Sequence, residues 1–313
     1  MMIQPSRRAV LGGGTAALLL AACGGDEGAK QAMAEEVSFK RQAGQPEVGI
    51  QTYTIREAME EDTGAAIQML KDVGYDFVET NDRDFTRVSM EELVAALRAA
   101  DMPVAATHIG FEAFRDDPQL AADQAKQLGA KYAILSWTPE EYRSTAGYTE
   151  MAGMLEAAGR VMQQNGLRFA YHNHHFEFWE IDGPRNGQEI YLEETDPALV
   201  DFELDLFWAA LGKQDVPALF RRYPGRFKLC HIKDMVTANM TDAAANGTDF
   251  DLIHKDLMVN VGEGDLPFAE WLAMSDVSGM EYLITEHDAP PAPLRDSVAM
   301  SLKTVRGYDL SAA

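Results

Sequence analysis

The chain contains little cysteine, few basic residues and no apolar run long enough to span a membrane stably. Only Cys23 and Cys230 occur among 313 residues, so there is neither a disulfide framework nor the clustered thiolates of a soft-metal or iron–sulfur site. Acidic residues outnumber basic ones by 50 to 27, which gives a net charge of −23. Such a surface repels polyanions, and we do not expect nucleic acid as a partner.

The N-terminal stretch PSRRAVLGGGTAALLLAAC combines paired arginines, a short apolar run and a cysteine. Its SRRAVL part resembles the twin-arginine translocation motif, and LAAC resembles the lipobox of bacterial lipoproteins. The resemblance implies a signal peptide over residues 1–22, lipidation of Cys23, and export to the periplasm or cell exterior. The membrane would be contacted only through this lipid anchor. A buried N-terminal helix is the alternative, which Gly12, Gly13 and Gly14 disfavour.

Residues 23–45 are small, polar and charged without apolar periodicity, which predicts a flexible tether. From residue 46 to residue 313, short apolar runs alternate with longer amphipathic ones. The expected strands lie within residues 47–53, 75–80, 103–110, 131–137, 167–174, 199–208, 227–235 and 281–288. The expected helices lie within residues 63–73, 89–100, 117–129, 148–166, 188–194, 216–223, 266–275 and 294–306.

Eight such βα units over this length predict an α/β fold, a single (β/α)8 TIM barrel of about the usual 250 residues. A doubly wound sheet is the alternative. In a barrel the chemistry lies at the carboxyl ends of the strands. Nearly every predicted strand delivers an ionisable residue there, namely Glu79, His108, His172, His174, Glu177, Asp205, His231, Lys233, Glu286, His287 and Asp288.

Imidazoles and carboxylates together suit a divalent ion such as Mn²⁺, Zn²⁺, Co²⁺ or Mg²⁺. We therefore expect one divalent metal at this rim, with a purely structural polar rim as the alternative. The metal would polarise a carbonyl or vicinal diol of the substrate.

The motifs VGIQTYTIRE, GYDFVET, THIGFE, YHNHHFEF, ELDLFWA, HIKDM, VGEGDLPFAEW and YLITEHD, in this order, resemble the sugar phosphate isomerase/epimerase family. That family has a xylose isomerase-like barrel and includes inosose dehydratases, hydroxypyruvate isomerases and ketose 3-epimerases. The resemblance implies a metal held by side chains from strands 5 to 8. Asp205, His231 and Glu286 match three of these ligands. The strand-5 ligand is either His172 or Glu177, and we favour Glu177 because it preserves the charge of the site.

The remaining rim residues suggest roles in binding and catalysis. Lys233 is expected to hold a substrate hydroxyl or stabilise an oxyanion, and His108 and His174 to bind hydroxyls or move a proton. Trp208 is expected to offer an apolar wall to a sugar. The expected catalytic residues are Glu177, Glu286, His174 and Lys233, and the expected substrate-binding residues are His108, His172, Lys233, Trp208 and Glu79.

The resemblance and the site predict proton abstraction next to a carbonyl, giving isomerisation, epimerisation or dehydration. The chain has no glycine-rich phosphate loop and no arginine cluster at the rim, so a non-phosphorylated sugar, keto-glycoside or cyclitol is the expected substrate. The alternative is a catalytically inactive, surface-tethered sugar-binding lipoprotein. The negative charge and the export signal disfavour a third possibility, a zinc endonuclease on the same barrel. The oligomeric state stays open.

Overall fold

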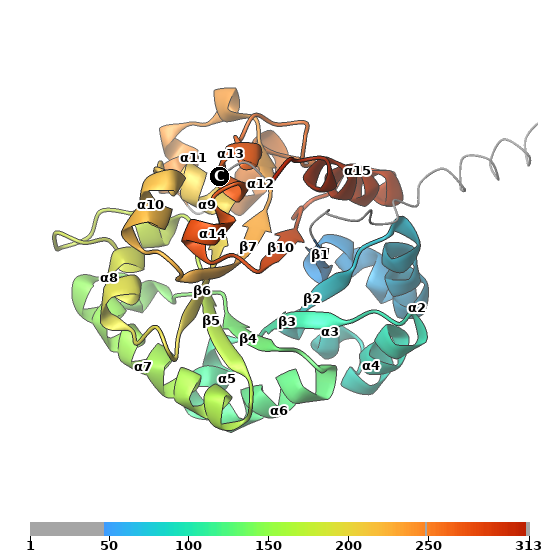
Figure 1. The fold of residues 1–313 in the computed structure, drawn as a ribbon, viewed down its shortest axis with the longest axis horizontal. Helices are drawn as coiled ribbons and strands as arrows, with labels where there is room; N and C mark the ends of the chain where they lie inside the picture. The colour runs from blue at the N-terminus through green and yellow to red at the C-terminus, as the bar shows by residue number, and fades with distance from the viewer. Residues whose placement is uncertain (1–46, 248, 311–313) are drawn as a thin grey trace, which may run out of the picture. The chain divides into compact units, whose positions relative to one another are not determined.

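In a computed structural model of the chain, residues 47–247 and 249–310 are described, and eight parallel strands close into a barrel (Figure 1). Around the ring the strand order is β1, β10, β7, β6, β5, β4, β3, β2. The structure thus confirms the predicted (β/α)8 barrel. The predicted signal peptide, the tether up to residue 45 and the lipidated Cys23 lie outside the described residues. The barrel strands are β1 (Val48–Gln51), β2 (Phe77–Asn81), β3 (Val104–His108), β4 (Tyr132–Leu135), β5 (Arg168–His172), β6 (Asp201–Asp205), β7 (Phe227–Ile232) and β10 (Tyr282–Thr285).

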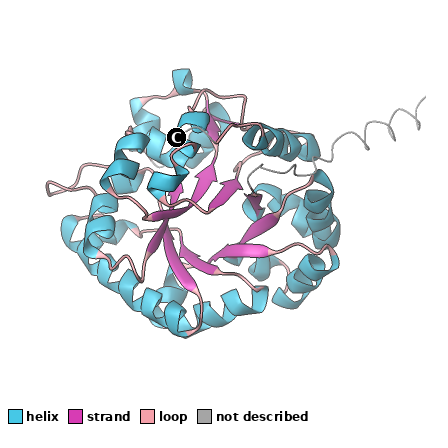
Figure 2. Ribbon diagram, in the orientation of Figure 1, coloured by secondary structure: helices cyan, strands magenta, loops and turns pink. Residues whose placement is uncertain are grey.

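Helices surround this ring of strands (Figure 2). Within the described part of the chain, no helix is both long and apolar enough to cross a membrane. The main outer helices are α2 (Arg56–Val73), α4 (Met90–Ala99), α6 (Pro118–Leu128), α7 (Thr145–Gln164), α8 (Gly187–Glu194), α10 (Val216–Arg222), α13 (Phe268–Leu272) and α15 (Leu294–Arg306). Shorter helices are η1 (Thr52–Ile55), α3 (Asp82–Arg87), α5 (Phe111–Asp116), η2 (Glu140–Tyr142), η3 (Phe176–Phe178), α9 (Leu206–Leu211) and α14 (Ser275–Ser278).

Strand β6 is shorter than predicted. The apolar stretch of residues 199–208 indicates one strand, but the strand ends at Asp205. The Oδ1 atom of Asp205 accepts a hydrogen bond from the backbone N–H of Trp208 at 3.0 Å and so caps α9. Phe207 and Trp208 therefore lie on a helix. The apolar residues 206–208 that follow Asp205 do not distinguish a buried strand from a buried helix, which explains the error.

The barrel interior beneath the strand ends is filled by apolar side chains. Its buried cluster includes Phe77, Tyr132, Ile134, Leu229 and Ile284. Gly49 makes room for the ring of Phe77, because a Cβ at this position would lie 2.1 Å from Phe77 Cε2. This closely packed interior supports the polar side chains above it and limits their movement.

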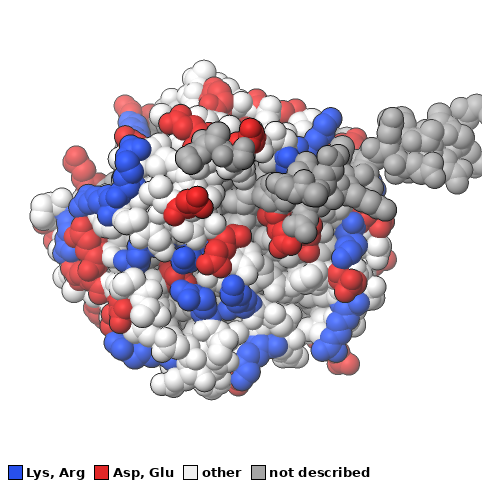
Figure 3. Space-filling view, in the orientation of Figure 1, with Lys and Arg blue, Asp and Glu red and all other residues white. Residues whose placement is uncertain are grey.

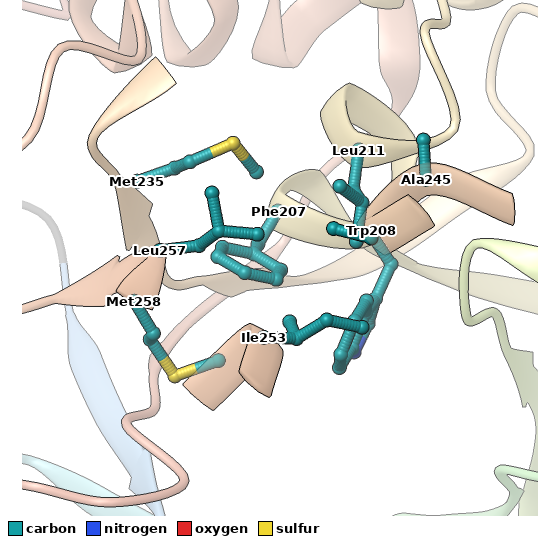
Figure 4. Close-up of a cluster of buried hydrophobic side chains, with 9 residues drawn as sticks. Phe207, Trp208, Leu211, Met235, Ala245, Ile253, Leu257 and Met258 are labelled. Atoms are coloured by element: carbon teal, nitrogen blue, oxygen red, sulfur yellow. The ribbon is translucent and has the colours of Figure 1, made fainter. Parts of the chain in front are cut away.

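A long excursion leaves the barrel between β7 and α13. It consists of β8 (Asp234–Met235), η4 (Thr237–Asn239), α11 (Asp242–Asn246), α12 (Phe250–Asp256) and β9 (Met258–Val259), and β8 pairs antiparallel with β9. Its apolar side chains pack on those of α9 (Figure 4). This shared core fixes the excursion against the barrel. It contains Phe207, Trp208, Leu211, Met235, Ala244, Ala245, Ile253, Leu257 and Met258.

Acidic and basic side chains are interspersed on the face of the molecule shown in Figure 3. Several form ion pairs, such as Arg222 with Glu193 at 2.9 Å. Exposed pairs of this kind contribute little to stability, so the fold depends on its core.

Two glycines of α7 give a test of close packing. A Cβ at Gly159 would lie 2.5 Å from the backbone oxygen of Leu199, whereas a Cβ at Gly153 would meet nothing within 4 Å. Gly159→Ala should therefore lower the free energy of unfolding by about 1–3 kcal/mol. Gly153→Ala should raise it by about 0.5–1 kcal/mol. Urea unfolding of both variants measures this, and equal effects would contradict the packing described here.

Candidate metal centre and active site

The strand register brings charged residues of neighbouring strands side by side. His172 of β5 is the partner of Glu203 of β6, and Asp205 of β6 is the partner of His231 of β7. Side chains alternate along a strand, so Glu203 and Asp205 lie on the same face. All four side chains are buried inside the carboxyl end of the barrel.

An outer group is formed by Asp205, His231 and Glu286, whose ligand atoms lie within 4.8 Å of one another. Nδ1 of His231 lies 2.8 Å from Glu286 Oε2 and 3.9 Å from Asp205 Oδ2. The Nζ atom of Lys233 lies 2.7 Å from Glu286 Oε2 and 3.2 Å from Asp205 Oδ2. On its other side the same ammonium contacts Asp288 Oδ1 at 3.2 Å.

His172 presents a ring nitrogen to this group. Its Nδ1 lies 3.0 Å from Glu203 Oε2, and its Nε2 lies 3.7 Å from Asp205 Oδ2. Burial, with the charges of His231 and His108, holds the pKa of His172 well below its ordinary value, so the ring is neutral. Nδ1 then donates its proton to Glu203, and Nε2 turns a lone pair towards Asp205. The Oδ2 atom of Asp205 is buried and is contacted by the ammonium of Lys233 at 3.2 Å.

An inner group lies deeper in the barrel. It comprises Glu79, His108, Glu203 and the Nε2 side of His231. Nε2 of His231 lies 2.6 Å from Glu79 Oε1, and Nε2 of His108 lies 2.8 Å from Glu203 Oε2 and 3.0 Å from Glu79 Oε1. Gln51 also donates to Glu79, at 2.8 Å. These contacts fix the ring of His231 from behind.

The pKa shifts in the inner group indicate which of its side chains carry a proton. Burial lowers the pKa of His108, but Glu79 and Glu203 outweigh it and raise that pKa to about 10. Burial likewise opposes protonation of His231, yet Glu203, Glu79 and Glu286 raise its pKa well above the ordinary value. Burial opposes ionisation of Glu79, but His108 and His231 hold its pKa well below the usual range. Burial and the charge of Glu79 raise the pKa of Glu203 to about 7.

The ammonium of Lys233 is a fixed charge. Burial lowers its pKa, but Asp205, Asp288 and Glu286 raise it well above the ordinary value. The side chain is 4% exposed and lies over the ring of Trp208, with Nζ 5.4 Å from the ring centroid. Lys233 therefore offers N–H donors to any oxygen that reaches this group.

The structure brings most of the predicted rim residues together. The assembled ones are Glu79, His108, His172, Asp205, His231, Lys233 and Glu286, with His174 and Trp208 at the mouth above them. Sequence reasoning missed Glu203, although its spacing of two residues from Asp205 on one strand was a usable signal.

Glu177 is the exception among the predicted ligands. Its buried carboxyl group accepts hydrogen bonds from the Tyr171 hydroxyl at 2.6 Å and from the backbone N–H of His174 at 2.8 Å. Tyr171 alternates with His172 and so lies on the outer face of β5. The structure therefore places Glu177 behind the barrel wall, outside both groups, and leaves His172 as the strand-5 side chain that faces Asp205.

Aromatic rings surround the mouth above the polar groups. The ring of His174 is stacked on Phe176 with centroids 5.3 Å apart, and it packs edge-on against Trp137 at 5.2 Å. From the excursion, Phe250 lies 6.2 Å from both Trp137 and His174. Nδ1 of His174 is buried without a hydrogen-bond partner. Sequence reasoning missed Trp137 and Phe250, because no local pattern shows which loops meet at the mouth.

Comparison with known proteins agrees with this architecture. A family model described as "Xylose isomerase-like TIM barrel" matches residues 67–304. A search of curated proteins finds no match.

Solved structures share the fold. A sugar phosphate isomerase/epimerase from Parabacteroides distasonis aligns with a TM-score of 0.69 at 20% identity, covering 88% of this chain and 99% of that one. The IOLI protein with a bound zinc atom aligns with a TM-score of 0.63 at 14% identity, covering 84% and 99%. The 3-keto-D-glucoside 4-epimerase YcjR from E. coli aligns with a TM-score of 0.62 at 14% identity, covering 84% and 99%.

The buried Glu177 predicts a pH dependence of stability. Burial raises its pKa from 4.5 to about 7, so the folded state keeps a proton that the unfolded state releases. The contribution of Glu177 to the free energy of unfolding therefore falls as the pH rises from 4.5 to about 7, and is constant above that. Glu177→Gln cannot ionise, so its stability relative to wild type should increase across this interval.

Urea unfolding at several pH values measures this difference. The exposed Glu281→Gln serves as the control. A difference between Glu177→Gln and wild type that does not change with pH would refute the assignment.

Proposed function

Because the chain belongs to the family of xylose isomerase-like TIM barrels, we propose that it is a divalent-metal-dependent sugar isomerase, epimerase or dehydratase. The proposed reaction moves a proton next to a carbonyl of a non-phosphorylated sugar, keto-glycoside or cyclitol. One observation carries the proposal. His172 Nε2 and Asp205 Oδ2, two buried acceptors, face each other at 3.7 Å, and the ammonium of Lys233 lies 3.2 Å from the carboxylate oxygen.

The donor set fits a divalent cation. Two acceptors at such a distance repel each other unless a cation or proton lies near both, and burial raises the cost of that repulsion. We assign Asp205, His231 Nδ1, Glu286 and His172 Nε2 as the residues that would hold the ion. A divalent ion there would act as a Lewis acid on the substrate carbonyl and a neighbouring hydroxyl. The set of two imidazoles and two carboxylates suits Zn²⁺, Mn²⁺ or Co²⁺ better than Mg²⁺.

The side chains around this ligand set would bind the substrate and transfer its proton. Lys233, a fixed ammonium, donates to the oxygen on which negative charge develops. We assign proton abstraction to Glu286, whose Oε2 is already held by Lys233 and His231. His174 is neutral, because burial and then Lys233 hold its pKa well below the ordinary value. Its unpartnered Nδ1 can bind a substrate hydroxyl.

The substrate class and the location complete the proposal. The mouth offers aromatic faces at Trp137 and Phe250, which suit the apolar face of a sugar ring. The names of the similar structures include an epimerase of a 3-keto-D-glucoside.

The twin-arginine and lipobox motifs support export of the protein and lipidation at Cys23. An exported protein would meet free sugars rather than cytoplasmic phosphates. Mass spectrometry of the protein from membranes tests the lipid.

Metal binding gives the first test. Asp205→Asn should abolish Zn²⁺ binding measured by titration calorimetry. Glu203→Gln, which alters the partner of His172 Nδ1, should weaken binding about 10- to 100-fold. The exposed Glu281→Gln should bind as wild type.

The pH dependence of binding gives a second test. Because His231 must lose its Nδ1 proton, Zn²⁺ binding should release a proton, and the affinity should increase by about tenfold per pH unit below the pKa of this histidine. Unchanged Zn²⁺ affinity in Asp205→Asn would contradict the ligand set.

Hydrogen exchange tests the reaction. The Mn²⁺-loaded protein, incubated with keto-sugars in deuterated water, should incorporate deuterium next to the carbonyl, and Glu286→Gln should lose this incorporation. Mass spectrometry or NMR detects the label. Metal binding without exchange of any keto-sugar, but with measurable sugar affinity, would favour the inactive sugar-binding protein instead.

A further inference from the structure

A chain of buried hydroxyl groups runs behind the barrel wall and ends on Glu177. Thr138 Oγ1 lies 2.7 Å from the Tyr191 hydroxyl and 2.6 Å from the Tyr171 hydroxyl, and Tyr171 donates to Glu177 at 2.6 Å. Because Tyr171 donates its one hydroxyl proton to Glu177, it can only accept from Thr138, and this fixes the direction of the chain. Tyr191 donates to Thr138 and Thr138 donates to Tyr171, so that Thr138 and Tyr171 each donate once and accept once. Such chains strengthen cooperatively in a low-dielectric interior.

The other oxygen of Glu177 holds the segment that carries His174. Strand β5 ends at His172, so no sheet ladder fixes the residues that follow. The backbone N–H of His174 donates to Glu177 Oε2 at 2.8 Å. From the neighbouring strand β6, the backbone N–H of Asp205 donates to Oδ1 of Asn173 at 3.0 Å. The segment is therefore held by Glu177 and by β6.

The same chain of hydroxyl groups also reaches Trp137, the second aromatic residue at the mouth. Thr138 directly follows Trp137 and is fully buried, whereas Trp137 is 38% exposed. The Nε atom of Arg143 donates to the backbone oxygen of Thr138 at 3.1 Å, and its guanidinium carbon lies 3.6 Å from the ring centroid of Phe176. Trp137 and His174 follow different strands, and the hydroxyl chain joins the residues beside them.

We propose that Glu177 is a positioning residue and that, with Tyr171 and Thr138, it sets the place of His174 and Trp137 at the mouth. It acts on a substrate only through these two rings. The kinetic part of this inference rests on the proposed function, and the geometric part does not. A buried acid here holds two donors at once, from Tyr171 and from the backbone of His174, which an apolar side chain cannot do.

Histidine NMR of the metal-loaded protein tests the geometric part. Selective ¹³C labelling of the Cε1 positions gives one signal for each of the seven histidines, and His174→Asn identifies the signal of His174. Tyr171→Phe and Glu177→Leu should shift this signal and leave Zn²⁺ affinity unchanged. Glu177→Gln should retain it, because its oxygen can accept from His174 and its amide can donate to Tyr171.

Tyr132→Phe is the matched control. It removes a buried tyrosine hydroxyl on β4 that has no hydrogen-bond partner. For a keto-sugar that exchanges deuterium, Tyr171→Phe should raise KM by about tenfold with kcat within about twofold, and Tyr132→Phe should leave both unchanged.

A His174 signal that stays in place in Tyr171→Phe overturns the proposal. So does a shift of equal size in Tyr132→Phe, since loss of any buried hydroxyl would then suffice. If Glu177→Leu fails to fold, Tyr171→Phe decides alone. If no sugar exchanges in wild type, the proposed reaction fails, while the ring signal still decides whether Glu177 positions His174.

Discussion

Five carboxylates, from Glu79, Glu203, Asp205, Glu286 and Asp288, are buried at the carboxyl end of the barrel, and the electrostatic cost of burying them constrains everything around them. The compensating charges are the ammonium of Lys233 and the protons on His108 and His231. Each of these groups is held in its charged form against the effect of its own burial. Three positive charges thus face five carboxylates, and no member of the set changes without affecting its neighbours.

His231 connects the two halves of this set. One ring nitrogen faces Glu79 and Glu203 of the inner group, and the other faces Glu286 and Asp205 of the outer group. The inner carboxylates hold the ring in place and favour donation from Nε2. The outer nitrogen then points to the same place as His172 Nε2 and Asp205 Oδ2. This division explains why a network of buried acids lies beneath the four side chains that we propose as metal ligands.

The fold and the centre of the site were predictable, because both follow from periodic patterns. Eight apolar runs indicated eight strands, and their ends indicated Asp205, His231 and Glu286. The sequence could not decide where a choice depended on the turn after a strand. Glu177 and His172 were both near the end of β5, and charge balance favoured Glu177, whose carboxyl group the structure places beside Tyr171. Only the backbone path through η3 shows that Glu177 turns back to Tyr171. The position of Phe250 could not be predicted for a different reason, because it depends on the packing of the excursion on α9.

The apolar core beneath the excursion allows residues of the excursion to be substituted independently of the charged residues inside the barrel. Residues of α12 that face the mouth belong to a segment supported by Phe207, Trp208 and Leu211 of α9, and the charged set inside the barrel is supported by the strands. A lineage can therefore exchange the outward side chains of α12 while the charge balance beneath stays intact. Divergence of substrate preference and retention of the chemistry are thus assigned to different parts of one domain.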